Sequence, residues 1–143
     1  VSALLFVITL IMNIFSNHPA EVLILLFLIV TFLQSGIDKL FDWKGNLSFI
    51  KSHFKNSPLK NSVPLLLGII LIMEILASLL MIIGVYQLYT SELKEMAILG
   101  IIISALSLIF LLVGQRLAKD YAGAMTLAVY FIITIIGLIL LTN

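Results

Sequence analysis

Long apolar runs separated by short polar connections divide the whole chain. Four of these runs are long enough, at about 1.5 Å per residue, to cross roughly 30 Å of hydrocarbon as helices. The predicted spans are residues 19–41, 63–88, 96–113 and 121–141. Short connections between consecutive spans favour antiparallel neighbours. The pattern therefore predicts an all-α fold, an antiparallel four-helix bundle in a membrane.

Two further segments accompany the spans. Residues 1–15 are apolar but reach only about 22 Å as a helix, and they lack the basic start and the cleavage site of a signal peptide. We expect an additional short N-terminal helix there, either a short span, an interfacial segment or the first arm of a helical hairpin. Residues 44–57 are expected to form an amphipathic connection beside the membrane. The whole chain, residues 1–143, is predicted to be a single transmembrane domain.

Composition strengthens the membrane assignment and removes several classes of site. Hydrophobic residues make up 62% of the chain and charged residues 10%, against about 45–50% and 25% in soluble proteins. The absence of cysteine excludes disulfides and thiolate metal sites. Both histidines, His18 and His53, lie outside the spans, which disfavours a haem held by paired histidines. We expect no metal site, no catalytic activity of its own and no nucleic-acid partner.

The distribution of basic residues predicts an orientation. Seven of the eight lie at or beside the connections 42–62 and 114–120, and Lys94 alone lies on the other side. Lysine and arginine concentrate on the cytoplasmic side of membrane proteins. The two connections are therefore predicted to be cytoplasmic and the C-terminus outside, in a bacterial inner (cytoplasmic) membrane.

A single carboxylate, Glu74, interrupts the second span near its middle. A charge at that depth is expensive and needs a reason. The depth of each residue is counted at about 1.5 Å per residue from the predicted cytoplasmic end of its span. This depth counting places Gln34 about 10 Å, Ser107 about 10–13 Å, Tyr130 about 13 Å and Glu74 about 16 Å into the membrane. We therefore expect one buried polar cluster or ligand-binding site of Glu74, Gln34, Tyr130 and Ser107, with Gln34 and Tyr130 in direct contact with Glu74.

The expected state of Glu74 follows from its surroundings. No basic residue lies near it by depth, and burial disfavours the ionised form of a carboxyl group, so we expect a protonated Glu74. Asp38 and Lys39 lie near the predicted interface, where solvated side chains explain them. The pattern leaves two roles for Glu74 open, a functional site and a structural hydrogen bond.

Several short segments resemble one known family. Residues 35–40 (SGIDKL) close the first long span, Gly68, Glu74 and Gly84 are spaced along the second, and residues 115–124 (QRLAKDYAGA) open the last. Together these features resemble the DoxX family of small membrane proteins, over about residues 19–141. The resemblance implies a core of four transmembrane helices and a role near quinone or redox chemistry, often as a partner subunit. Related proteins include a subunit of an archaeal thiosulfate:quinone oxidoreductase.

Three functions are consistent with these features. The first is an accessory subunit of a larger membrane complex, respiratory or redox, whose partners are other membrane subunits and the lipid bilayer. The second is a binding protein that holds a quinone or a lipid in a polar pocket around Glu74; no cofactor other than a quinone is indicated. The third is a small proton-coupled transporter that uses Glu74, although no broken helix of the kind that accompanies transport sites is evident.

Overall fold

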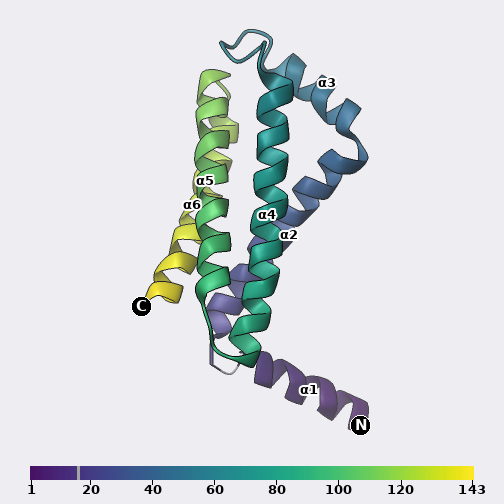
Figure 1. The fold of residues 1–143 in the computed structure, drawn as a ribbon, viewed down its shortest axis with the longest axis vertical. Helices are drawn as coiled ribbons and strands as arrows, with labels where there is room; N and C mark the ends of the chain where they lie inside the picture. Colours follow the sequence, from purple (N-terminus) through teal and green to yellow (C-terminus); the bar gives the residue numbers. More distant parts are fainter. Residues whose placement is uncertain (16) are drawn as a thin grey trace.

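The computed structural model describes residues 1–15 and 17–143, which form helices joined by turns, with no strand in the described residues. The helices are α1 (Ser2–Phe15), α2 (Pro19–Phe41), α3 (Trp43–His53), α4 (Val63–Thr90), α5 (Glu95–Leu117) and α6 (Tyr121–Thr142). The four long helices α2, α4, α5 and α6 are each long and apolar enough to cross a membrane. They pack against one another as an antiparallel bundle (Figure 1), so the predicted fold class is confirmed.

Two of the long helices extend further than the apolar pattern suggested. α4 continues to Thr90, and α5 continues through Gly114 to Leu117, about one turn beyond residue 113. A glycine inside a helix costs only about 1 kcal/mol, which neighbouring contacts readily offset. The extra turn of α5 matters for the site because it carries Gln115 and Arg116 as helical residues.

The helices follow one another around the bundle in the order α2, α4, α5, α6, and the most extensive contact joins α4 to α5. Small residues allow this close approach. A Cβ added to Gly84 of α4 would lie 2.5 Å from the Cα atom of Ala97 on α5. A Cβ added to Gly100 of α5 would lie 2.9 Å from the backbone nitrogen of Met81 on α4. Without a hydrophobic driving force between helices in lipid, such backbone contact is a main source of stability.

Two aspartates determine how the chain turns at one end of the bundle. Asp42 separates α2 from α3 and accepts a hydrogen bond from the Gly45 backbone N–H at 3.1 Å. Asp120 begins α6 in the same way, accepting from the Gly123 N–H at 2.9 Å. Each cap satisfies a backbone donor that a helix start leaves free. The turn before Asp120 includes Lys119 with φ 60°.

The two shorter helices lie at opposite ends of the bundle (Figure 1). α1 extends away from the end where α4 turns into α5, and its contacts with the bundle are mainly with α2. α3 folds back from the end of α2 toward the start of α4. It ends at His53, and residues 54–62 continue as turns, so the helical part of the predicted connection 44–57 is shorter than expected. We call this end of the bundle the α3 end.

Candidate functional site

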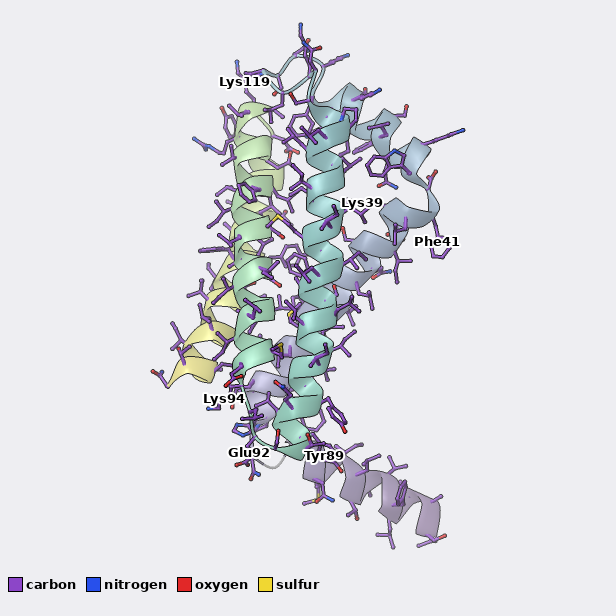
Figure 2. All side chains as sticks on the ribbon, viewed as in Figure 1. Lys39, Phe41, Tyr89, Glu92, Lys94 and Lys119 are labelled. Carbon is purple, nitrogen blue, oxygen red and sulfur yellow. The ribbon has the colours of Figure 1, made fainter. Side chains whose placement is uncertain are left out.

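The buried carboxylate of Glu74 has a charged partner. Its side chain is 3% exposed, and the Lys39 Nζ atom of α2 lies 2.9 Å from its Oε2 atom and 3.3 Å from its Oε1 atom. The Ser35 hydroxyl donates to Glu74 Oε1 at 3.1 Å and accepts from Lys39 Nζ at 2.7 Å. The three side chains therefore close a ring of hydrogen bonds between α2 and α4. In Figure 2, Lys39 lies between the ribbons of these two helices.

A glycine on α2 allows this ring to form. Gly36 is buried, and a Cβ added to it would lie 2.6 Å from Ile75 Cδ1 and 3.8 Å from Glu74 Cβ. The missing side chain lets α2 approach α4 at the level of Glu74. Ser35 and Lys39 are one helical turn apart, so they share a side of α2 and reach the same carboxylate.

The expectation that no basic residue lies near Glu74 is wrong, as is the expectation that Lys39 is solvated. The Lys39 side chain is only 13% exposed. Depth counting treated the spans as parallel rods, whereas α2 crosses behind α4 at an angle (Figure 1). The long lysine stem also carries its ammonium group well beyond the level of its own Cα atom. A carboxylate and an ammonium group buried together, each with further hydrogen bonds, meet the condition under which a buried ion pair is tolerated.

The other three residues of the predicted cluster lie elsewhere. Gln34 is exposed on a different side of α2 from Lys39. Tyr130 of α6 packs at the edge of the hydrophobic core, with its ring centroid 6.2 Å from that of Phe27. Ser107 of α5 is fully buried, and its hydroxyl has no hydrogen-bond partner among the described residues. The structure therefore does not bring Gln34, Tyr130 or Ser107 into hydrogen-bond contact with Glu74.

A cavity of about 490 Å³ opens beside the ring and extends beneath α3. Ser35, Lys39 and Glu74 border it at one end. Its volume falls within the range of roughly 300–1,000 Å³ that is typical of small-molecule sites. Its walls are mainly apolar side chains from four helices and the turn after α3. These are Phe49, Ile50, Phe54, Leu59, Leu66, Leu67, Ile70, Phe110, Leu111 and Leu127.

A second polar group borders the same cavity at the α3 end. His53 Nε2 of α3 lies 2.9 Å from Gln115 Oε1 of α5 and 3.4 Å from Asp120 Oδ2 at the start of α6. Gly123 leaves room for this arrangement, because a Cβ there would lie 2.6 Å from Gln115 Nε2. The contacts of His53 attach the last turn of α3 to the bundle. The cavity therefore has apolar walls between two polar groups, which suits an amphiphilic molecule.

Five polar residues of this site were missed as site residues in the sequence: Ser35, Lys39, His53, Gln115 and Asp120. Four of them lie in the segments that carry the family resemblance, residues 35–40 and 115–124. The spacing of Ser35 and Lys39, one turn apart on the helix that precedes Glu74, was the available signal. His53 had no such signal, because its partners are 62 residues away or more along the chain.

Among residues 1–15 and 17–143, no three His, Asp or Glu side chains are arranged to hold a metal ion.

Comparison with known proteins adds one match. The family model described as DoxX matches residues 22–114, which include most of α2, all of α3 and α4 and most of α5. The matched region contains Ser35, Lys39, His53 and Glu74. Neither the curated proteins nor the solved structures that were compared with the chain gave a match.

Proposed function

The chain belongs to the DoxX family, and we propose that its membrane bundle binds a quinone-type amphiphile in the cavity beneath α3. One observation carries this proposal: a cavity of about 490 Å³ with apolar walls has the Lys39–Glu74 pair at one end and His53 with Gln115 at the other. A quinone has the complementary shape and chemistry, a flat apolar ring with a carbonyl group on opposite sides.

The residues at both ends fit that chemistry. Quinone carbonyls accept hydrogen bonds, and at the inner end the donor is the Lys39 ammonium group, which would turn one N–H from Ser35 to the carbonyl while the Ser35 hydroxyl stays donated to Glu74. Glu74 keeps the ammonium group of Lys39 neutralised, so no net charge faces the apolar ring. At the α3 end the His53 Nε2–H donates to Gln115 Oε1, which leaves the amide N–H groups of Gln115 as the donors for a carbonyl. Lys39 and Ser35 thus take the positions beside Glu74 that the sequence suggested for Gln34 and Tyr130.

The proposed location is the cytoplasmic membrane of a bacterium, with the α3 end on the cytoplasmic side. The exposed cations support this orientation, because Lys44, Lys51, Lys55, Lys60 and Lys119 all belong to connections at the α3 end. A molecule that enters the cavity would then come from the cytoplasmic leaflet. Accessibility of single introduced cysteines from each side of the membrane, in a chain that has no cysteine of its own, checks the orientation.

The binding proposal is tested by what accompanies the purified protein. The wild type and a Lys39→Met/Glu74→Met double variant are purified from membranes in a mild detergent, and quinones are extracted and quantified per mole of protein. The double variant removes both charges together, which is far less disruptive than leaving one charge buried alone. Glu21→Gln, which alters a carboxylate at the opposite end of the bundle, is the matched control.

We expect quinone in near-stoichiometric amount with the wild type and the Glu21→Gln control, and its loss from the double variant. Quinone at the level of the detergent background in the wild type would contradict the proposal. Equal quinone in all three proteins would show that it binds elsewhere on the protein or in its lipid annulus, and would contradict the assignment to this cavity.

An accessory role in a larger membrane complex is the second proposal, and α1 is the feature that favours it. This helix is mainly apolar and extends away from the bundle, with Phe6 69% and Met12 65% exposed. Such a helix offers a surface for another membrane subunit. Removing residues 1–12 is expected to reduce the size of the native complex while the quinone content stays unchanged.

The transport hypothesis has no comparable support, because α2, α4, α5 and α6 each run without a break.

A further inference from the structure

Gln34 is a polar side chain on the outer side of the bundle. It is exposed, and its amide group makes no hydrogen bond to any of the described residues. It lies seven residues before the end of α2 at Phe41, about 10 Å along the helix axis, and so within the hydrocarbon layer. Lipid chains offer no hydrogen-bond partner, so an amide at this depth is costly unless something other than lipid covers it.

Gln34 is the centre of a regular stripe along α2. The stripe consists of exposed residues at alternating intervals of four and three, a spacing that allows two helices to pack side by side. Exposed residues of α4 and α6 recur at the same intervals, so the amide of Gln34 is what distinguishes the stripe on α2. Its members are Leu23, Phe27, Val30, Gln34, Ile37 and Phe41. Val30 is 62% and Phe41 87% exposed, and Figure 2 shows Phe41 pointing away from the bundle. The buried residues Leu25, Leu28 and Phe32 occupy the opposite side of the helix.

We propose that this stripe is the interface between two copies of the chain, with Gln34 hydrogen-bonded to Gln34 of the second copy. An amide group carries both donors and an acceptor, so two glutamines related by a two-fold axis satisfy each other. Identical chains insert in the same orientation, so both Gln34 side chains lie at the same depth without further adjustment. Interhelical amide hydrogen bonds hold such helix pairs together in membranes. The exposed Asp38, one turn after Gln34, lies beside the stripe near the end of α2, where its carboxylate reaches the headgroup region.

The interface and the ligand site occupy different sides of the same helix. Ser35 and Lys39 face α4 and the cavity, whereas Gln34 and Ile37 face outward. Association of two copies therefore leaves the cavity uncovered, and the dimer is independent of what the cavity binds. Failure of the quinone experiment leaves the dimer proposal intact, and the reverse also holds.

The absence of native cysteine allows a direct test by cross-linking in membranes. Single cysteines are introduced in the stripe, as Val30→Cys and Ile37→Cys, with Gln34 unchanged. Matched controls place cysteine at exposed positions on other helices, as Ile72→Cys on α4 and Met125→Cys on α6, where the native side chains are 67% and 72% exposed. We expect oxidation to give covalent dimers from the two stripe positions and only background from the two controls.

The contribution of Gln34 is measured in the same system. Gln34→Leu, combined with Val30→Cys, is expected to weaken self-association by about 3- to 30-fold, the range for one interhelical hydrogen bond in a membrane. Thr126→Val on α6 removes a polar group from another exposed position and is expected to leave the dimer unchanged. A leucine at an outward position keeps the bundle intact, which an unchanged unfolding midpoint confirms.

Equal cross-linking at all four cysteine positions would overturn the proposal, because it would indicate random collisions in the membrane. Dimers that persist undiminished in Gln34→Leu would overturn the role of the amide. Adducts of the stripe cysteines with a different protein, in place of homodimers, would overturn the assignment of the stripe to a second copy.

Discussion

Breaking the Lys39–Glu74 pair tests the electrostatics of the site. In Glu74→Met the ammonium group of Lys39 stays buried beside Ser35 with no counter-charge, and in Lys39→Met the carboxylate of Glu74 keeps only the Ser35 hydroxyl. Removing one member of a buried pair costs about 3–5 kcal/mol, because the remaining charge is uncompensated. With side chains 3% and 13% exposed, this pair has little water to screen it. We expect a loss of about 3 kcal/mol or more in the free energy of unfolding for each single variant.

The double variant Lys39→Met/Glu74→Met should behave differently from the sum of the two single variants. Replacing a whole buried ion pair by apolar side chains is often neutral or stabilising. We therefore expect the double variant to lie within about 1 kcal/mol of the wild type, which implies a coupling energy of at least about 5 kcal/mol between the two positions. This magnitude exceeds the roughly 0.5–3 kcal/mol that is usual for contacting residues, because each single variant leaves one charge buried alone.

The free energy of unfolding is measured by titrating the detergent-solubilised protein with a denaturing detergent and following helical circular dichroism. Glu92→Gln at the opposite end of the bundle is the control, because the Glu92 side chain is 60% exposed and its replacement should cost no more than about 1 kcal/mol. Additive losses in the Lys39 and Glu74 variants would refute the reasoning, because they would mean that the two charges do not stabilise each other in the bundle.

Two further predictions concern packing and the attachment of α3. Gly84→Ala should lower the free energy of unfolding by about 1–3 kcal/mol, because the added methyl group meets the α5 backbone at 2.5 Å. Gly68→Ala on the same helix, whose nearest neighbour would lie 4.0 Å away, should instead raise it by up to about 1 kcal/mol, measured in the same detergent titration. His53→Leu should free the end of α3 and accelerate thiol labelling of a cysteine placed at the cavity residue Leu111. Unchanged labelling would contradict the role of His53 in holding α3 over the cavity.

Helices and fold class could be predicted from the sequence because lipid imposes a length and a composition on every span. The apolar runs, together with the prolines and polar turns that bound them, predicted the start of α2 at Pro19, of α4 at Val63 and of α6 at Tyr121. The polar contacts inside the bundle could not be predicted to the same extent. Depth along a helix follows from counting residues, but the direction that a side chain faces depends on how each helix is tilted and rotated against its neighbours.

Gln34 and Lys39 illustrate the difference. Depth counting placed Gln34 nearer to Glu74 than Lys39, yet the structure turns Gln34 outward and brings the Lys39 ammonium group to 2.9 Å from the carboxylate. Helical spacing places Ser35 and Lys39 on one side of α2, and in the structure the small Gly36 lets this part of α2 approach α4. The contact of His53 with Gln115 joins two segments that only the folded bundle brings together.

Binding of a short-chain quinone, followed through the fluorescence of Trp43, shows whether the cavity beneath α3 holds a ligand. Trp43 is the single tryptophan and begins α3, one turn from the cavity residue Asn46, and its ring lies 4.0 Å from the Cβ position of Gly68 on α4. A quinone in the cavity should quench its fluorescence. We expect saturable quenching for the wild type in lipid nanodiscs and none beyond simple partitioning for Lys39→Met/Glu74→Met. Linear, unsaturable quenching that is identical in the two proteins would contradict this expectation.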